Sequence, residues 1–531
     1  MSAPARTAPT AAAPTTALVG TRPMLGLTLR RERLHGSAWY LLSGLLLLVV
    51  AAGIVATYPT PADRETLAAS VNASAGELFM IGPVASTDAG GIGLWRMQGI
   101  AAIFISLASI LTVVRNTRAP EESGTSEMLG SAAIGRAAPL AAALGVAAAG
   151  SLAAGFLVAG GFVAIGASGT GSVLVGAQVA AFGLLAAALA GLTGQIVQTA
   201  RAATGIAVAV VAACYLLRGA GDAIGGSAYW MSPFGWVAAV RPFAHGNGWM
   251  LLPVLALALV LAGGALWTAS RRDLGAGLLP ERVGPAHAST ALRGPTSLAL
   301  RTSRGAVIGW AAGALVIGLL IGGVSSTVDD QIDLALGSGA GSGAGLIQVA
   351  LYLSPLFAAI LGIQTTLRLR GEVTSGRAEA VLSRPVTRAR WLLAHTVTGG
   401  LAAVAVLAAF GLGIGLAQLG TDPGSFAVLA VSGALRAPAA WVFIALTTLL
   451  LATIPRAAAA VAFIVVGAFQ MLEFTVEFRL VPPEALYASP FALVPQLPDG
   501  ALHPWPALLL ILITAVLTAI AARRIRHQDI D

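Results

Sequence analysis

The sequence contains no lysine, and this absence excludes one large class of function. All 31 basic residues among its 531 are arginines. A phosphate-binding P-loop needs a lysine that reaches the phosphates, so this chain cannot complete one. The glycine-rich segment from Gly337 to Gly345 is therefore better explained as a flexible linker than as a nucleotide-binding loop.

Cysteine and charged residues are also scarce. Cys214 is the only cysteine, which excludes a disulfide framework, and we expect it to pack as a small apolar residue within a membrane span. Charged residues make up 10% of the chain and apolar residues 57%. This balance excludes a water-facing globular surface and indicates an all-α integral membrane protein.

Signatures of catalysis are missing as well. The sequence has no His or Cys cluster with metal-ligand spacing, no nucleophile elbow in a strand-to-helix setting and no nucleotide site. We therefore expect no enzyme, no metal and no cofactor in this chain, and any energy source must lie in another subunit. A membrane-bound enzyme acting on lipids is a weaker alternative because it lacks a catalytic cluster.

Long apolar runs predict about twelve transmembrane helices. A bilayer core about 30 Å thick requires roughly 20 apolar residues per helical span. In the first half, suitable runs cover 37–57, 93–114, 138–160, 172–194, 202–218 and 249–269. In the second half they cover 305–325, 346–367, 391–414, 429–453, 457–473 and 505–522. The runs at 202–218 and 457–473 are the shortest.

Polar landmarks recur between the two halves. Six residues between the second and third spans return 252 positions later: Arg118, Ser123, Gly124, Glu127, Ser131 and Arg136 return as Arg370, Ser375, Gly376, Glu379, Ser383 and Arg388. Before the first span of each half, Arg30, Arg33 and Trp39 return as Arg301, Arg304 and Trp310. Ser232, Pro233 and Phe234 return as Ser489, Pro490 and Phe491, and Arg271-Arg272 returns as Arg523-Arg524. These recurrences predict two parallel six-helix repeats.

The arginines predict the topology. With the N-terminus placed in the cytoplasm, 25 arginines fall in cytosolic segments, 3 in external loops and 3 within or beside spans. This asymmetry follows the positive-inside rule and predicts that both termini are cytoplasmic, in a cell (inner or plasma) membrane. The acidic residues divide more evenly, 10 inside and 13 outside, so the basic excess reports topology and does not indicate nucleic-acid binding.

These observations give the expected domain organisation, in which a disordered tail precedes the first membrane half and a cytosolic linker joins the halves. The segments are a cytoplasmic tail, 1–20; a first membrane half, 21–269; a linker, 270–297; a second membrane half, 298–524; and a C-terminal tail, 525–531.

Short polar segments at both ends of the spans could carry function. The stretches from Arg118 to Arg136 and from Arg370 to Arg388 each predict a short helix across the inner face, with Gly124 and Gly376 allowing a turn. The arginines before the first span of each half predict an amphipathic segment lying in the inner interface, although ordinary positive-inside flanking explains them equally well.

The predicted external ends of the spans allow more than one interpretation. The Ser-Pro-Phe loops predict either short helices forming an external lid or simple interfacial anchoring next to Trp249 and Trp505. Arg218 and Asp222 have the spacing of an ion pair on one helix face. Glu473 and Glu477 share that spacing, and we expect them to face water. His395 and Arg436 are exceptional as ionisable residues inside predicted spans.

A family resemblance rests on these segments. The stretches Arg118–Glu127, Gly376–Val386 and Arg271–Leu279, together with the Ser-Pro-Phe-Gly-Trp loop at Ser232, resemble ABC type-2 permeases of actinobacterial polyketide-antibiotic and multidrug exporters, of the tetronasin type. The resemblance covers nearly the whole chain after the N-terminal tail.

The resemblance implies a permease that works with a separate ABC ATPase, in two copies, which supplies ATP and Mg. It implies a coupling helix between the second and third spans and a connecting helix before the first. The implied coupling residues are Arg118, Gly124, Glu127, Arg136, Arg370, Gly376, Glu379 and Arg388, and the implied connecting-helix residues are Arg30, Arg33, Arg301 and Arg304. The first copy has Glu121-Glu122 where the second has Val373-Thr374, so the two halves are not expected to grip the ATPase equally.

The sequence-based hypothesis is therefore the permease subunit of an ATP-driven exporter of hydrophobic or amphiphilic compounds such as polyketide antibiotics and drugs. The alternative is a proton-coupled secondary drug transporter of the major-facilitator type. That class also has twelve spans in two parallel halves, but it does not explain the repeated cytosolic stretch, and its usual signature between spans two and three is not seen.

Overall fold

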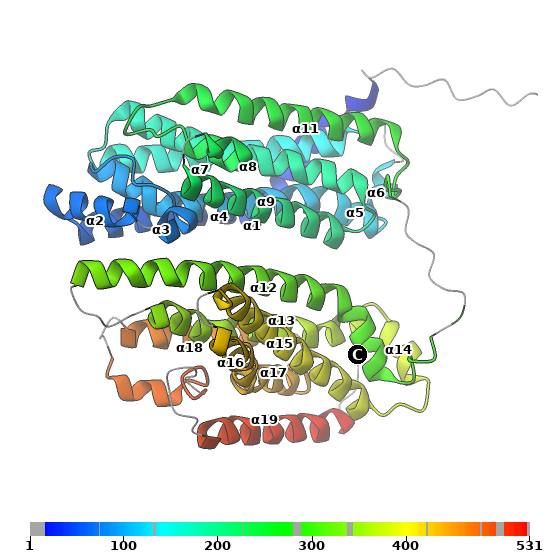
Figure 1. Ribbon diagram of the computed structural model, residues 1–531. Coiled ribbons are helices and arrows are strands. Elements are labelled where there is room, and N and C mark those ends of the chain that lie inside the picture. The colour runs from blue at the N-terminus through cyan, green and yellow to red at the C-terminus, as the bar shows by residue number, and fades with distance from the viewer. Residues whose placement is uncertain are drawn as a thin grey trace, which may run out of the picture. The chain divides into compact units, whose positions relative to one another are not determined.

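The structure is a computed structural model that describes residues 16–73, 75–130, 134–225, 227–279, 287, 289–336, 343–420, 423–477, 481–494 and 504–527 (Figure 1). The regular elements in these ranges are helices. The chain divides into two compact units, unit 1 (Met1–Gly284) and unit 2 (Pro285–Asp531). The predicted tails and the Gly337 to Gly345 segment lie wholly or partly outside the described residues.

Six long helices build unit 1, and short helices cap its two ends. The long helices are α1 (Thr21–Thr57), α4 (Ala89–Asn116), α7 (Ala138–Ala164), α8 (Gly169–Ile196), α9 (Ala200–Ile224) and α11 (Leu251–Arg271). At one end lie η1 (Thr16–Leu18), α5 (Arg118–Glu122) and α6 (Thr125–Gly130). At the other lie α2 (Pro61–Ala73), α3 (Ala75–Met80), η2 (Ala228–Met231), α10 (Pro233–Ala238) and η3 (Gly248–Met250). We call these the α5 end and the α10 end.

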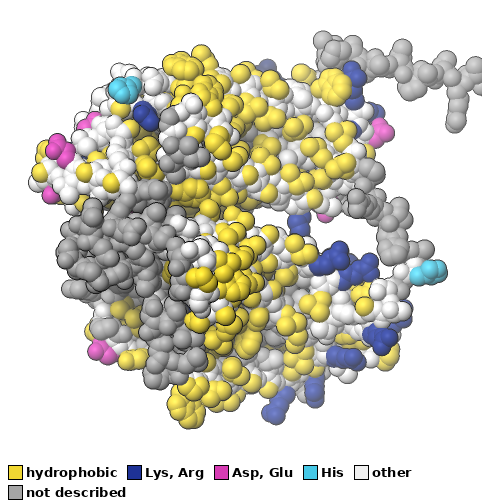
Figure 2. Space-filling model, viewed as in Figure 1, with side chains coloured by type: hydrophobic (Ala, Val, Ile, Leu, Met, Phe, Trp, Pro, Cys, Tyr) yellow, Lys and Arg dark blue, Asp and Glu magenta, His cyan; other side chains and the backbone are white. Residues whose placement is uncertain are grey.

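Unit 2 is also built of long helices. They are α12 (Pro295–Leu336), α13 (Gly343–Thr374), α15 (Arg388–Gln418), the pair α16 (Phe426–Leu435) and α17 (Ala437–Leu451), α18 (Ala458–Glu477) and α19 (Pro504–Arg524). The short ones are α14 (Arg377–Leu382), η4 (Pro423–Ser425), η5 (Pro483–Ala488) and η6 (Ile525–His527). Arginine side chains gather at the end that carries α14, whereas apolar side chains cover the helices (Figure 2).

Eleven spans in the described residues are long and apolar enough to cross a membrane, six in unit 1 and five in unit 2. The short predicted span at 202–218 is confirmed as Ala200–Asp222. The expected twelfth span, 457–473, falls on α18, a helix of 20 residues, whose described side chains give a shorter apolar stretch, Ala458–Glu473. At 1.5 Å per residue α18 is about 30 Å long, close to the thickness of the bilayer core. The described residues thus give eleven spans that meet the length criterion and one further apolar helix, α18, at the position predicted for the twelfth.

Small residues bring the helices of unit 1 close together. The α8 helix contacts α4, α7, α9 and α11 and is the most buried span. At its crossing with α7, a Cβ added to Gly155 would lie 2.4 Å from the Gly176 carbonyl oxygen, and one added to Gly176 would lie 2.5 Å from that of Gly155. Only glycine permits this backbone approach, as expected for helices packed in lipid.

The central helix of unit 2 is α15, which contacts α12, α13, α16 and α17. The α16–α17 span is interrupted at Arg436, two residues before Pro438, which lacks an N–H to continue the helix. The Arg436 side chain is buried and donates from Nη1 to the Ser432 carbonyl oxygen at 2.7 Å and from Nη2 to Oε1 of Gln348 at 3.5 Å. A charged side chain inside a span is thereby kept among polar partners.

The segments before the first spans differ from expectation. The α1 helix runs without a break from Thr21 to Thr57, and α12 from Pro295 to Leu336. The arginine-bearing segment and the span are therefore one continuous helix in each unit, and a separate interfacial helix that turns into the membrane is not formed.

Candidate functional site

A buried charge cluster lies at the α5 end of unit 1. Arg118, the first residue of α5, is 1% exposed and forms an ion pair with Glu121. Arg272 binds the same carboxylate, with Nη2 at 2.6 Å from Oε1 and 2.8 Å from Oε2. Two arginines thus share one carboxylate, and the three charges join the loop after α4 to the segment after α11.

Neutral groups complete this cluster. The Ala276 carbonyl oxygen accepts hydrogen bonds from Arg118 Nη2 at 2.8 Å and Arg272 Nη1 at 2.6 Å. Arg272 Nε donates to Oε1 of Gln195, near the end of α8, at 2.5 Å. The Leu278 N–H donates to the Gln195 carbonyl oxygen at 3.1 Å. The first part of the predicted linker is therefore bound to unit 1.

The adjacent carboxylate reaches another helix. Glu122 Oε2 accepts a hydrogen bond from the backbone N–H of Ala200, the first residue of α9, at 2.8 Å. Helix N-termini carry unpaired N–H groups and partial positive charge, so a carboxylate is favourable there. Through Glu121 and Glu122, α5 is attached both to α9 and to the segment after α11.

A second buried carboxylate attaches α1 to α4. Glu32 is 4% exposed and accepts from Arg115 Nε at 2.9 Å and Asn116 Nδ2 at 2.6 Å. The predicted residues Arg30 and Arg33 lie beside it on α1 and are exposed. The N-terminal part of α1 is thus bound to the C-terminal end of α4, next to α5.

The turn predicted at Gly124 is present. This residue has φ of 74° and separates α5 from α6, so the single predicted helix is two short ones. Glu127 lies exposed on α6 and takes no part in the Arg118 cluster. Arg136 is also exposed and pairs at 3.5 Å with Asp273, a surface contact that contributes little to stability.

Unit 2 has a comparable turn before α14. Gly376 has φ of 72° and precedes the helix, and Glu379 lies exposed in its first turn. Arg370 Nη1 donates to the carbonyl oxygen of Arg456 at 3.0 Å, and Arg388 begins α15. The structure therefore places Gly376 and Glu379 on an exposed loop helix, with Arg370 bound to the segment between α17 and α18.

A carboxylate at the end of α13 makes a contact that unit 1 lacks. Glu372 Oε2 accepts from Trp391 Nε1 at 2.9 Å and lies 3.3 Å from His395 Nε2, both on α15. Pro120 occupies the corresponding position in unit 1. In unit 2 this contact joins the last turn of α13 to α15, whereas in unit 1 α5 is attached to α9 and to the segment after α11.

The start of α12 also contacts the end of α13. Arg368 Nη1 donates to the Thr302 carbonyl oxygen at 2.5 Å and lies 3.3 Å from the Ser303 hydroxyl oxygen. The predicted residues Arg301 and Arg304 are exposed on either side. As in unit 1, the exposed arginines lie next to the contact that joins the two helices but take no part in it.

Among the predicted coupling residues, the structure therefore buries Arg118 and leaves Glu127 and Glu379 on the surface. Sequence reasoning did not identify the partners Glu121 and Arg272 as one ion cluster. A signal was present, since the Arg271-Arg272 pair recurs in the chain, but only the fold brings Arg272 to Glu121 across 151 positions of sequence.

The Ser-Pro-Phe loops form short structures docked on the long helices. In unit 1, Ser232 Oγ donates to the Cys214 carbonyl oxygen of α9 at 2.5 Å and accepts from the Phe234 N–H at 3.1 Å. The Phe234 ring packs edge-on against Phe182 of α8, with ring centroids 4.9 Å apart. The loop is part of the packed core of the unit, which goes beyond interfacial anchoring.

The second copy docks similarly but through a carboxyl side chain. Ser489 Oγ donates to Glu473 Oε1 of α18 at 2.6 Å, and Phe491 stacks on Phe443 of α17 at 4.8 Å. Glu473 is 7% exposed, so the expectation that it faces water is wrong. The error arose because i to i+4 spacing reports a shared helix face but not what covers that face. The Glu477 side chain lies outside the described residues.

The predicted Arg218–Asp222 pair is confirmed at 2.8 Å. Arg218 Nη1 also donates to the Ile81 carbonyl oxygen at 2.9 Å, and Nη2 donates to those of Phe79 and Met80 at 3.2 and 3.1 Å. One buried guanidinium thus attaches the first loop at the α10 end to α9.

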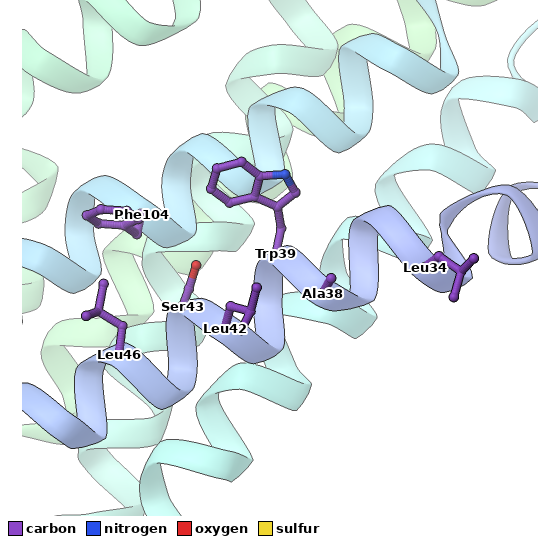
Figure 3. A pocket seen from close by; sticks show the side chains of 7 residues that line it. All are labelled: Leu34, Ala38, Trp39, Leu42, Ser43, Leu46 and Phe104. Atoms are coloured by element: carbon purple, nitrogen blue, oxygen red, sulfur yellow. The ribbon is translucent and has the colours of Figure 1, made fainter. Parts of the chain in front are cut away.

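An apolar groove of about 520 Å³ lies between α1 and α4 (Figure 3). Trp39 rises from α1 beside α4, which contributes Phe104, and Leu42 and Leu46 continue the wall along α1. Ser43 adds a single hydroxyl group. A wall of this composition can hold a hydrocarbon chain but offers no group for chemistry. In the part of the chain that the structure describes, no three His, Cys, Asp or Glu side chains are grouped to hold a metal ion.

Comparison with known proteins yields one family. Residues 292–526 match the family described as the multidrug efflux system permease Rv1217c, C-terminal domain. The chain is 34% identical over 524 residues to the multidrug efflux system permease protein Rv1217c of Mycobacterium tuberculosis (strain ATCC 25618 / H37Rv). The match covers 96% of this chain and 95% of that protein.

Proposed function

Because the chain belongs to the family of Rv1217c-like multidrug efflux permeases, we propose that it is the transmembrane subunit of an ATP-driven ABC exporter. In this proposal two copies of a separate ATPase bind at the α5 end of unit 1 and the α14 end of unit 2 and supply ATP and Mg. Both ends and both termini then face the cytoplasm, in agreement with the distribution of arginine.

One observation carries the proposal of coupling. In each unit an exposed glutamate, Glu127 or Glu379, lies on a short helix just after a glycine with positive φ. In unit 1 the short helix follows α5, whose Arg118 and Glu121 bind the segment after α11. In unit 2 it follows α13, whose last turn is bound to α15 through Glu372. A force applied to the exposed helix therefore reaches the spans through buried polar contacts, which transmit displacement better than a solvated loop does.

The cargo proposed is hydrophobic or amphiphilic, including drugs and polyketide antibiotics. The spans consist mostly of small and apolar residues. Apolar walls discriminate weakly between ligands of similar size, so one path can serve several lipophilic compounds.

Purification from the native host tests the partner. The full chain, tagged and solubilised gently, is expected to retain an ATPase with Walker motifs at about two copies per permease, identified by mass spectrometry. A permease that is recovered alone and transports under a proton gradient without ATP would overturn the proposal in favour of a secondary transporter.

Charge reversal tests coupling. We expect Glu127→Arg with Glu379→Arg to uncouple ATP hydrolysis from drug transport in vesicles that contain both subunits, lowering transport at least about tenfold, because a charge-assisted contact contributes about 1.5–3 kcal/mol. Glu65→Arg is the matched control, since Glu65 is equally exposed but lies on α2 at the opposite end of unit 1. Unchanged transport in the double variant would show that both glutamates are solvated loop residues without a role in coupling.

A further inference from the structure

Unit 1 contains a cavity of about 480 Å³ at its α10 end, away from the α5 cluster. The first loop, α4, the end of α9 and the segment from α10 to η3 all contribute to its lining. Its volume lies in the range of pockets that hold drug-sized molecules. No part of the coupling proposal uses this cavity.

Aromatic rings and polar groups line the cavity together. Trp95, Tyr229, Phe243 and Trp249 supply flat apolar surface. Gln98 lies among them, and its buried Nε2 donor has no hydrogen-bond partner within the described part of the chain. A buried amide donor without a partner is unfavourable by about 1–3 kcal/mol, so a ligand that accepts its hydrogen bond gains affinity.

The wall of the cavity carries one acidic and one basic residue. Asp222 lines it and is paired with the buried Arg218. Arg241 also lines it and is close enough to Asp222 to act on its charge. Because Arg218 already binds Asp222 at 2.8 Å, Arg241 is the positive group of the wall that can bind an anion.

The backbone at Arg241 is strained. Its φ of 44° is the only positive value at a non-glycine residue in the described ranges. The strain comes with a tight turn, in which the N–H groups of Ala244 and Gly246 both donate to the Arg241 carbonyl oxygen at 3.1 Å. A non-glycine residue in this region is strained and persists only where the surrounding structure holds it there, and such residues cluster at ligand sites.

We propose that this cavity binds an amphiphilic organic acid, with its apolar body against the aromatic wall, its carboxylate at Arg241 and a further oxygen accepting from Gln98. The second half of the chain has no arginine from Ser489 to Trp505, the segment corresponding to Ser232 to Trp249. The arginine of the proposed site therefore has no counterpart in that segment. Any role of this cavity in export rests on the proposed function, whereas the binding itself does not.

The test uses two probes with the same apolar body, 1-pyrenebutyrate and its methyl ester. The full-length permease is placed in phosphatidylcholine nanodiscs without ATPase or nucleotide, and energy transfer from tryptophan to pyrene measures binding. We expect Arg241→Gln to weaken binding of the acid about tenfold and to leave binding of the ester within about twofold, because only the acid makes a charge-assisted contact. Arg241→Lys keeps the charge and should retain most of the affinity.

Matched variants control for surface charge and folding. Arg64→Gln removes another arginine of unit 1 that does not line the cavity, and it should leave both probes unaffected. Gln98→Leu should weaken binding of both probes, since both carry a carbonyl oxygen. Equal affinity of the acid for the native chain and Arg241→Gln, or equal losses for acid and ester, would overturn the proposal.

A second measurement, in nanodiscs of an anionic lipid, identifies the source of the acid. Phosphatidylglycerol nanodiscs that abolish acid binding in the native chain show that an anionic lipid occupies the site, and unaltered binding shows that the site prefers a soluble acid. Both outcomes support an anion site at Arg241. Failure of probe binding leaves the export proposal standing, because no ATPase takes part in this measurement.

Discussion

At the scale of single residues, the serines of the two Ser-Pro-Phe loops offer a comparison within one chain. Ser232 donates to a backbone carbonyl oxygen, whereas Ser489 donates to the buried carboxyl group of Glu473. A hydrogen bond to a charged group contributes about 1.5–3 kcal/mol and one between neutral groups about 1 kcal/mol. We therefore expect Ser489→Ala to lower thermal stability in detergent more than Ser232→Ala. Equal decreases would contradict an ionised partner for Ser489.

Arg272 allows a second prediction at this scale. Its removal in Arg272→Gln leaves Glu121 with Arg118 alone and breaks the contacts to Gln195 and Ala276. Breaking a buried ion pair destabilises by about 3–5 kcal/mol, so a large decrease in melting temperature is expected. Arg271→Gln is the control, because Arg271 is exposed and only stacks on Trp267 at 4.4 Å, a contact of about 1 kcal/mol or less. Similar melting temperatures for both variants would argue against the cluster.

At the scale of the helices, α7 provides its own control. Gly155 has the Gly176 carbonyl oxygen 2.4 Å from the position of an added Cβ, whereas Gly160 has no atom within 4 Å. Gly155→Ala forces α7 and α8 apart, and overpacking of this kind is unfavourable by about 1–3 kcal/mol. Gly160→Ala should be neutral or slightly stabilising, because alanine favours a helix more than glycine. The measurement is the free energy of unfolding of both variants in a mildly denaturing detergent. A smaller decrease for Gly155→Ala than for Gly160→Ala would refute the prediction.

The loop helices show how similar elements are attached in different ways. Unit 1 uses Glu121 and Glu122 to hold α5, and unit 2 uses Glu372 to reach α15. The positive φ of Gly124 and Gly376 gives both loops the same turn. Similar backbones therefore rest on different polar contacts, which supports the expectation that the two units do not respond equally to a partner.

At the scale of the whole molecule, the proposed topology has a direct test. Cys214 is the only cysteine, so a Cys214→Ala chain provides a clean background for single new cysteines. We expect an impermeant maleimide to label Thr60→Cys in intact cells and Ser123→Cys only after permeabilisation, because the arginine distribution places the α5 end inside. Both positions are exposed, so a difference in labelling between them does not result from burial. The reverse pattern of labelling would invert the topology.

Much of the architecture could be predicted from the sequence. Apolar run length reports the spans because a helix must cross a hydrocarbon layer of nearly constant thickness. The turns at Gly124 and Gly376 and the Arg218–Asp222 pair were accessible for a similar reason, since each depends on local geometry. Local rules of this kind require only the neighbours in the chain.

The sequence by itself thus determined a helical membrane protein, the places of its polar loops and the absence of a nucleotide site that requires lysine. Only the tertiary structure decided that Arg272 meets Glu121, that Glu473 is buried under Ser489 and that a cavity forms beside Arg241. These contacts join segments from different helices, and their distances follow from how the spans pack. Burial and ion pairing depend on that packing because a charge leaves water only where the fold supplies a partner.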